Sequence, residues 1–457
     1  MTATGGDPAF EAATFRRIAW RLVPLLFLGY IAAFLDRVNV GFAKLQMASD
    51  LAFSDAVYGF GAGIFFIGYF LFEVPSNLVL RKVGARLWLA RIMISWGLIS
   101  SAFLFTGVIP WGPVSSAFGL TDQQFSFYAL RFLLGAAEAG FFPGVILYLT
   151  YWFPAQRRAQ MVAWFMTAIA MSNIVGSPLS GAILQFMDGA SGLRGWQWLF
   201  LLEGIPSVVI GLVFLFLLTD RPEVAKWLND EERTLIERRI AEEESAKSSA
   251  GQGHSIIDAF RDPRVWAFCL VYFCGTQCLY AINFWMPTII SEFGVPAADY
   301  FRVGLLSMIP WGVTVIVMVL WARHSDMTGE RRWHSAGGLF LAMFGLVALA
   351  FTDSSPILSM AALAAVTMGS LCWVTTFWSL PTSFLSGAAA AAGIAWINSI
   401  GNLGGYVGPE LIGQIRTASN GDSDAAFFVL AGAALLGGLA ILVATLKRRS
   451  AAPRRAA

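Results

Sequence analysis

Four charged residues lie inside apolar segments of the sequence, where charge is costly. Asp36 and Arg37 fall in the first long apolar segment, and Arg131 and Glu138 fall in the fourth. A charged side chain at the centre of a membrane-spanning helix costs about 2.5–3.5 kcal/mol on insertion scales, so such residues are usually functional. Each segment holds one acid and one base away from its ends, and these four charges sum to zero.

Helical geometry predicts how these side chains are directed. Arg131 and Glu138 are two turns apart, so they share one face of a helix. Asp36 and Arg37 are neighbours that point about 100° apart, so one can face a cavity while the other reaches an adjacent helix. A purely structural network of buried ion pairs is one interpretation, although desolvation often cancels the Coulomb attraction of such pairs.

Exchange of ionic partners is the other interpretation. While Asp36 and Glu138 are ionised, they neutralise the two arginines. When an acid binds a proton, a guanidinium loses its partner and can bind the carboxylate of an incoming anion through its planar fork. Protons and an anion that bind cooperatively in this way satisfy the requirement for symport.

The segments that position these residues are typical of membrane-spanning helices. The 457 residues are 57% hydrophobic and 13% charged, which is about half the charge content of a soluble domain. A spanning helix needs about 20 mostly apolar residues, and the sequence predicts twelve. They are 20–43, 57–80, 87–108, 124–150, 159–186, 197–219, 264–290, 301–323, 335–352, 356–380, 388–414 and 425–446.

The basic residues predict the orientation of these spans. Lys and Arg are concentrated in one set of loops, which the positive-inside rule assigns to the cytoplasm. An even number of spans then places both termini in the cytoplasm. The first residues lack the apolar core of a secretory signal, so we expect the first span to remain in the mature protein.

A charged segment divides the spans into two sets of six. Residues 220–263 are rich in charge and then in Ser and Gly, which predicts a solvated helix followed by a flexible linker. The expected organisation is therefore a six-helix bundle in 1–219, a cytoplasmic loop in 220–263 and a second six-helix bundle in 264–457. Substrate sites often lie near the membrane midplane between two such halves.

Three further residues are candidates for gating or structural roles. Pro178 and Pro409 lie in Gly-rich motifs of the fifth and eleventh spans, where small residues permit close packing and proline kinks a helix. Tight packing and a gating hinge are both open for these motifs. Glu73 lies in the cytoplasmic half of the second span, where it could pair with a basic residue of 81–86.

The second half offers polar and aromatic side chains in place of central charges. These are Gln277, Tyr280 and Asn283 in the seventh span, Thr375, Trp378 and Ser379 in the tenth, and Asn398 and Asn402 in the eleventh. Each is suited either to hydrogen bonding between helices or to substrate contact. We expect this half to select which substrate fits.

The cysteines and histidines form no pattern typical of a metal site. The four cysteines, Cys269, Cys274, Cys278 and Cys372, lie in apolar segments without the paired spacing of zinc ligands. The three histidines show no ligand spacing either. Packed thiols are expected, with no metal and no cofactor, and the net charge of +2 does not indicate nucleic-acid binding.

The sequence resembles the anion:cation symporter family of the major facilitator superfamily over nearly all spans. Its motifs are specific together rather than singly. They include Leu35-Asp36-Arg37-Val38-Asn39, Gly68-Tyr69-Phe70-Leu71-Phe72-Glu73-Val74-Pro75-Ser76-Asn77, Arg131-Phe132 with Glu138-Ala139-Gly140, Tyr151-Trp152-Phe153-Pro154 and Gly329-Glu330-Arg331-Arg332-Trp333-His334. The second, fourth and fifth spans are most similar to the branch of tartrate and 4-hydroxyphenylacetate permeases.

This resemblance implies an all-α integral membrane protein with the major facilitator fold, twelve transmembrane helices in two six-helix bundles. It also implies proton-driven uptake of a small organic anion by alternating access. By matching position, Asp36 and Glu138 are the proton sites and Arg37 and Arg131 are the neighbouring bases. The matching substrate contacts are Tyr69, Thr375, Trp378 and Asn398, and Asn283 is added from its polar position in the seventh span.

The substrate stays open within this family. A tartrate-like hydroxy-dicarboxylate is favoured, and an aromatic acid or a sugar acid is the alternative. Phe34 replaces a tyrosine of some sugar-acid carriers, which argues against a heavily hydroxylated sugar acid. A proton-antiport exporter fits the balanced charges less well. An enzyme would need a clustered His, Ser or metal constellation; none is visible in the sequence, so an enzyme is not expected. A transporter-like receptor would differ only in lacking flux.

The expected setting follows from the same resemblance. We expect a multi-pass protein of the bacterial inner membrane that works as a monomer. Its partners would be the lipid bilayer, protons and a small organic anion, and nucleic acid is not expected among them.

Overall fold

The computed structural model describes residues 8–249, 260–296, 298–352, 355–383, 385 and 387–446. These residues form α-helices joined by short turns and 3-10 helices, and no strand occurs among them. Long apolar runs favour helices in a membrane because a helix satisfies its backbone hydrogen bonds internally. The Gly-rich end of the expected linker lies outside the described residues.

The helices follow the predicted spans. The first half contains α1 (Pro8–Asp50), α2 (Asp55–Val83), α3 (Ala85–Ala102), α4 (Pro113–Ala117), α5 (Asp122–Glu138), α6 (Phe141–Trp152), α7 (Ala155–Met166), α8 (Ala168–Phe186) and α9 (Gly195–Leu217). After α10 (Asp230–Ser249) come α12 (Pro263–Ser291), α13 (Tyr300–Thr328), α14 (Arg332–Leu349), α15 (Pro356–Phe377), α16 (Gly387–Asn402), α17 (Gly404–Ala418) and α18 (Asp424–Ala444).

Eleven helical segments of the described chain are long and apolar enough to cross a membrane. The eleventh predicted span is divided into α16 and α17 at Leu403, and each part is shorter than a bilayer crossing. The fourth span is also interrupted, between α5 and α6, where Gly140 has a φ of +89°. A Cβ there would lie 2.4 Å from Oγ of Ser76, so glycine is required. This break makes Glu138 the last residue of α5.

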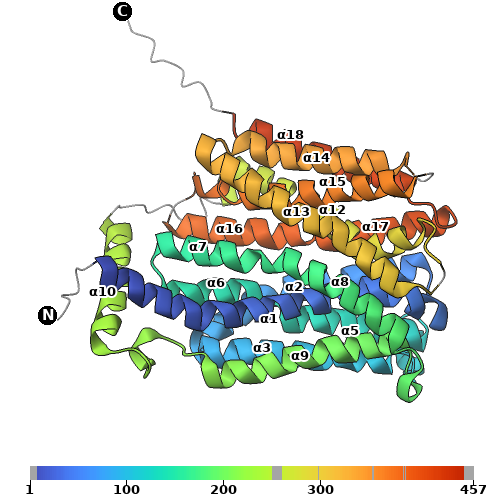
Figure 1. Ribbon diagram of the computed structural model, residues 1–457, viewed down its shortest axis with the longest axis horizontal. Helices are drawn as coiled ribbons and strands as arrows, with labels where there is room; N and C mark the ends of the chain where they lie inside the picture. The colour runs from blue at the N-terminus through green and yellow to red at the C-terminus, as the bar shows by residue number, and fades with distance from the viewer. Residues whose placement is uncertain are drawn as a thin grey trace, which may run out of the picture.

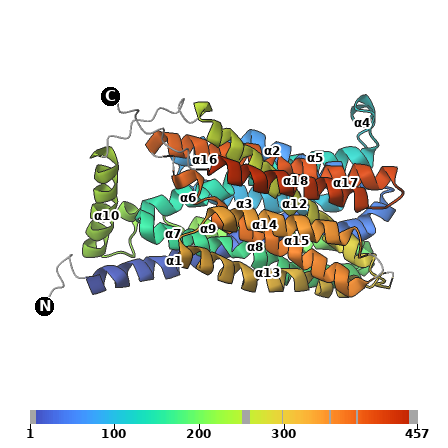
Figure 2. The same ribbon diagram turned by 90° about the horizontal axis from the view of Figure 1, so that it is seen from above.

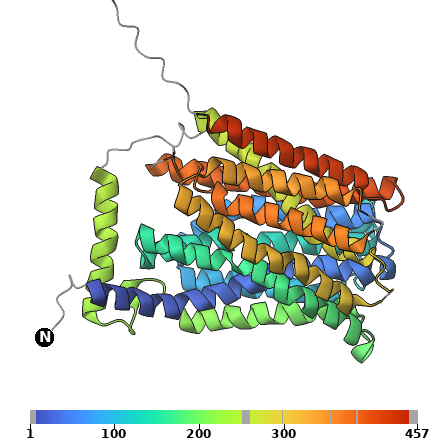
Figure 3. The same cartoon turned by 45° about the horizontal axis from the view of Figure 1, so that its top comes forward.

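The two halves lie side by side as two groups of helices. In Figure 1 the first half (blue to green) lies below the second half (orange to red), and α10 stands across one end of the bundle. We call this the α10 end; the opposite end, where α4 projects in Figure 2, is the far end. Figure 3 shows that α1 begins and α18 finishes at the α10 end.

The halves meet chiefly along two helix pairs, α8 with α13 and α2 with α17, and α1 also contacts α12. Glycine permits the close approach of the backbones in both pairs. A Cβ on Gly181 of α8 would lie 2.4 Å from the backbone oxygen of Tyr300, and one on Gly413 of α17 would lie 2.4 Å from that of Asp55. Pro178 lies inside α8 and Pro409 inside α17. Both proline motifs are therefore part of the contact between the halves, and a hinge there stays a prediction.

Ion pairs fasten α10 to the first half. Arg17 of α1 binds Glu232 with an N–O distance of 2.9 Å, and Arg158 of α7 lies 3.4 Å from Glu243. The charged helix predicted after the sixth span is thus docked against the ends of α1 and α7.

Candidate functional site

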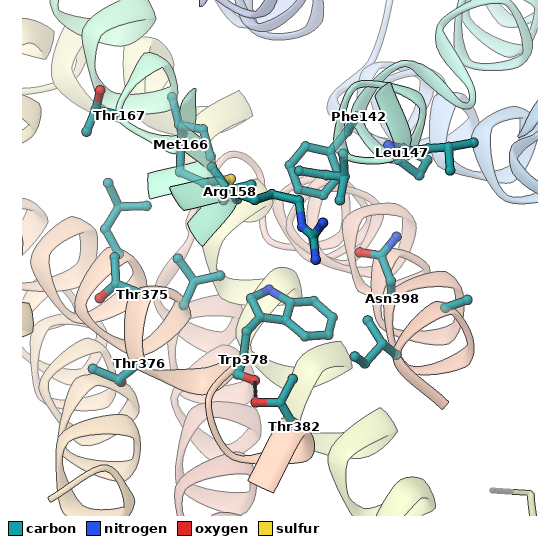
Figure 4. A pocket seen from close by; sticks show the side chains of 18 of the residues that line it. Phe142, Leu147, Arg158, Met166, Thr167, Thr375, Thr376, Trp378, Thr382 and Asn398 are labelled. Atoms are coloured by element: carbon teal, nitrogen blue, oxygen red, sulfur yellow. Dashed lines mark hydrogen bonds between the residues drawn. The ribbon is translucent and has the colours of Figure 1, made fainter. Parts of the chain in front are cut away.

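A cavity of about 1200 Å³ lies between the halves and reaches the α10 end. Its walls come from α2, α6 and α7 of the first half and from α13, α15 and α16 of the second. Figure 4 shows the guanidinium of Arg158 extending into this space, with Trp378 and Asn398 around it. Arg81 and Arg323 line the same cavity. A cavity with a basic rim favours anionic solutes.

A smaller chamber of about 60 Å³ adjoins this cavity. Phe142, Trp378 and Asn398 line both spaces. The chamber is walled mainly by aromatic rings, which are Tyr30, Phe34, Phe66, Phe142, Tyr69, Tyr272, Tyr280 and Trp378. Arg37 is the charged member of this lining among the described residues.

Arg37 is buried and links the two halves. One guanidinium nitrogen donates to Oε1 of Glu138, and another donates to the hydroxyl of Tyr280 on α12 at 2.9 Å. The rings of Phe34 and Tyr69 lie 4.8 and 5.7 Å from its Cζ atom. Its Nε has no hydrogen-bond partner among the described residues. The guanidinium therefore keeps donor capacity at the wall of the chamber.

Asp36 reaches away from the chamber into the first half. Its carboxylate accepts hydrogen bonds from Nε1 of Trp96 at 3.0 Å, Oγ of Ser100 at 2.7 Å and Oγ of Ser207 at 2.5 Å. These donors belong to α3 and α9. Asp36 and Arg37 thus diverge as neighbours on a helix must, and within the described chain Asp36 forms no ion pair.

Arg131 lines neither the cavity nor the chamber. It is fully buried and donates to the backbone oxygens of Gly61 at 3.2 Å and Ala62 at 3.0 Å. Although Arg131 and Glu138 are two turns apart, Glu138 forms its ion pair with Arg37 instead. The expected four-charge network is therefore reduced to one ion pair among the described residues, because α2 offers Arg131 carbonyl oxygens as acceptors.

The predicted substrate contacts are only partly assembled. Tyr69, Trp378 and Asn398 line the chamber, and Thr375 lines the wide cavity while its hydroxyl donates to Cys372 O at 2.9 Å. Asn283 lies in neither lining; its amide nitrogen donates to Leu279 O of its own helix at 3.0 Å. Its carbonyl oxygen is buried without a hydrogen-bond partner among the described residues, and a substrate contact for Asn283 stays a prediction.

Glu73 has partners that the sequence did not indicate. Its Oε1 accepts from Nδ2 of Asn398 at 2.8 Å and its Oε2 accepts from Oγ of Ser399 at 3.2 Å. The suggested ion pair with a basic residue of 81–86 is absent from the described part of the chain. Glu73 is buried against α16 and joins the two halves beside the cavity.

The far end is closed by an ion cluster that sequence reasoning missed. This far-end ion cluster consists of Lys44, Asp55, Glu292 and Arg416. Asp55 lies 2.8 Å from Nζ of Lys44 and 2.9 Å from Nε of Arg416, and Arg416 also lies 2.6 Å from Glu292. Lys44 and Arg416 fall just outside the predicted spans 20–43 and 388–414, but they lie within α1 and α17. The sequence did contain a signal for this cluster: acids and bases of both halves lie near the ends of predicted spans on the same side of the membrane.

Further contacts close the bundle beneath this cluster. The Tyr58 hydroxyl donates to Phe284 O at 2.8 Å, and Nε1 of Trp285 donates to Pro409 O at 3.1 Å. Lys44 lies 4.1 Å from the centre of the Trp285 ring. The structure is therefore open at the α10 end and sealed at the far end.

The cysteines take no part in this site. All four are buried and form no disulfide, as expected for packed thiols. The described residues contain no group of three or more His, Cys, Asp or Glu that could hold a metal ion.

Comparison with known proteins identifies the family. Residues 26–409 match the model of the Major Facilitator Superfamily. A relative from Agrobacterium vitis named "Putative tartrate transporter" is 50% identical over 433 residues, 95% of this chain and 91% of the relative. A "Quinolone resistance transporter" from Acinetobacter baumannii is 40% identical over 89% of each chain.

A solved structure supports the fold alone. The proton:xylose symporter XylE bound to a bromodeoxyglucose is 14% identical over 93% of this chain and 95% of that one, with a TM-score of 0.71. The apolar helices, the cavity between two halves and the family match agree with one another. The chain is a multi-pass membrane protein and a transporter rather than an enzyme, and it belongs to the Major Facilitator Superfamily.

Proposed function

We propose that this transporter takes up a small organic anion together with protons. The observation that carries the proposal is the ion pair that Arg37, which lines the chamber, forms with the buried carboxylate of Glu138, which is not itself part of the lining. The Agrobacterium vitis relative supports a tartrate-like hydroxy-dicarboxylate as the substrate. An aromatic acid such as 4-hydroxyphenylacetate is the alternative, and the aromatic lining of the chamber favours it.

Coupling follows from competition for one guanidinium. In the resting site the carboxylate of Glu138 occupies Arg37. When Glu138 takes up a proton, it no longer neutralises Arg37, and the substrate carboxylate replaces it as the acceptor. Because Arg37 stays charged at all physiological pH values, the proton must bind to the acid. Proton and anion then favour each other's binding, and the coupling is reciprocal.

Asp36 is proposed as the second proton site. Its three donors satisfy a carboxylate without a cationic partner, so a proton there would not compete with substrate for Arg37. The two acids would thus have different roles: protonation of Glu138 is coupled to substrate binding at Arg37, whereas protonation of Asp36 is not.

Alternating access gives the two ends of the bundle their roles. We place the α10 end in the cytoplasm of a bacterial inner membrane, because the positive-inside rule puts both termini there. The structure would then be inward-open, with the far-end ion cluster closing the outer path. The halves 1–219 and 264–457 would rock about α8–α13 and α2–α17, with no partner beyond lipid, protons and anion.

Flux in proteoliposomes tests the proposal. Purified protein is reconstituted with an alkaline interior, and uptake of radiolabelled tartrate and 4-hydroxyphenylacetate is followed with and without a proton ionophore. We expect accumulation of at least one anion that the ionophore abolishes, and counterflow that persists without a gradient. Protein-free liposomes and the Arg37→Ala variant are the controls.

A proton-antiport exporter is the second candidate, because one relative is named for quinolone resistance. The Arg37–Glu138 pair argues against it, since the chamber presents a base to the solute. The same liposomes, loaded with a quinolone, separate the two functions. Quinolone movement against protons, with no exchange of any carboxylate, would establish the exporter and refute the symporter.

A further inference from the structure

The side-chain amide of Asn398 is held in one orientation. Its nitrogen donates to Oε1 of Glu73 at 2.8 Å, and the other oxygen of Glu73 accepts from the Ser399 hydroxyl at 3.2 Å. Both oxygens of Glu73 thus act as acceptors in this structure. Glu73 therefore binds the N–H side of Asn398, and the carbonyl oxygen must turn the other way.

The carbonyl oxygen of Asn398 faces the binding space. Figure 4 shows this oxygen directed into the cavity, on the side of Arg158 and Trp378. Asn398 lines both the cavity and the chamber that contains Arg37. Among the described residues, no hydrogen bond to this oxygen is found. The site therefore offers an anchor for a carboxylate at Arg37 and a pure acceptor at Asn398.

An acceptor at this place recognises a hydroxyl group. A substrate carboxylate cannot donate to it, and an apolar group packed against this part-buried amide would leave the carbonyl oxygen without a partner, which is costly. A hydroxyl group donates to the carbonyl and removes that cost. Sites built to bind a substrate hydroxyl reject analogues that lack it.

We propose that Glu73 sets the hydrogen-bond polarity of Asn398, so that the transporter selects anions that carry a hydroxyl group. Glu73 is a positioning residue in this scheme, and Asn398 is the residue that contacts substrate. The inference rests on the proposed function, because it assumes that the anion binds at Arg37. It applies equally to a hydroxy-dicarboxylate and to a hydroxylated aromatic acid, which share the same donor.

The test uses matched pairs of anions that differ by one hydroxyl. The pairs are malate with succinate and 4-hydroxyphenylacetate with phenylacetate. Each anion is added as an unlabelled competitor, and its inhibition of counterflow is measured with whichever radiolabelled anion the protein exchanges. For the wild type we expect the hydroxylated member of the transported class to inhibit at about 3- to 10-fold lower concentration, the ratio that one hydrogen bond gives. The same ratio is then measured for four variants.

The variants separate positioning from packing. Asn398→Leu removes the acceptor at similar size, and Glu73→Met removes the group that orients it; both should bring the ratio close to one, mainly by weakening the hydroxylated anion. Glu73→Gln keeps an oxygen that can accept from Nδ2 of Asn398, so it should retain the wild-type ratio. Asn77→Ala alters the same cavity wall without touching the Glu73 carboxylate, and it should leave the ratio unchanged.

The possible outcomes are distinct. A wild type that exchanges these anions but does not distinguish the members of either pair would overturn the inference and leave the proposed function standing. A ratio that survives in Asn398→Leu, or that Glu73→Gln loses as fully as Glu73→Met, would also overturn it. Exchange of no carboxylate at all would refute the proposed function itself.

Discussion

Arg37 on α1 donates a hydrogen bond to the carboxylate of Glu138 at the end of α5, and the two side chains are only 7% and 3% exposed. Removing one partner from a buried ion pair leaves an uncompensated charge, which typically costs about 3–5 kcal/mol. Neither residue can lose its partner unless a proton or another ion takes its place. This constraint makes the pair suitable for coupling.

Glu138→Gln should uncouple transport from protons. Glutamine binds no proton and leaves Arg37 without a competing carboxylate, so the anion should bind at least as tightly as in the wild type. Uptake driven by a pH gradient should be lost, whereas counterflow should continue. Both are measured in the same proteoliposomes, with Glu410→Gln as a control acid outside the chamber and the cavity. Normal gradient-driven accumulation by Glu138→Gln would show that the pair is only structural.

Arg37→Lys and Arg131→Lys should have different effects, because the structure gives the two arginines different partners. Lysine cannot hold Glu138, Tyr280 and a substrate carboxylate in the geometry of a guanidinium. We expect Arg37→Lys to weaken anion binding by about 10- to 100-fold, the range for hydrogen bonds to charged groups. Arg131→Lys should lower the Tm and change affinity by less than about threefold. Ligand-dependent thermal shifts of the detergent-solubilised protein report both quantities, and equal affinity losses would contradict this division.

Asp36→Asn should affect protons without affecting substrate. Asp36 contacts Trp96, Ser100 and Ser207 and lies outside the lining of the chamber. The affinity for the anion, measured by counterflow, should therefore stay within about threefold of the wild type. This change is smaller than the loss of one hydrogen bond to a charged group would cause. Accumulation along a pH gradient should fall. If Asp36→Asn accumulated the anion normally, Asp36 would have to be reassigned as a purely structural residue.

The far-end ion cluster should control which end of the bundle is open. Arg416→Ala removes the base that binds both Asp55 and Glu292, so the far end should open more often. A Thr288→Cys reporter in a background without the four native cysteines is labelled with a membrane-impermeant maleimide. Labelling should become faster by at least about fivefold, which corresponds to roughly 1 kcal/mol.

Arg194→Ala is the matched control for this experiment. Arg194 also pairs with an acid at the far end, Asp50 at 2.8 Å, but both residues belong to the first half. Its removal should not change the labelling rate. An equal increase for the two variants would mean that the cluster has no special role in closure.

Most of the fold could be predicted because hydropathy dominates in a membrane protein. The twelve apolar segments correspond to helices. Hydropathy alone does not reveal that the fourth and eleventh spans are interrupted. The break at Gly140 depends on a positive φ and on the nearby Ser76. Such a requirement arises only when α2 packs against the fourth span.

The candidate site was less predictable for a physical reason. Spacing along one helix shows which side chains share a face, but not which neighbouring helix that face meets. Arg131 and Glu138 share a face, yet α2 supplies carbonyl oxygens to Arg131 while α1 supplies Arg37 to Glu138. Glu73 likewise meets Asn398, from the other half of the chain.

The neutrality of the Arg37–Glu138 pair has an electrical consequence. Before loading, the pair consists of one positive and one negative side chain; after the proposed exchange, it consists of a protonated acid and a guanidinium bound to one substrate carboxylate. The net charge is zero in both states, so neither form does work against the membrane potential, which amounts to about 2.3 kcal/mol per charge at 100 mV. The voltage would then act on the proton proposed for Asp36 and on any second carboxylate of the substrate, so current recordings would measure the balance between these two charges.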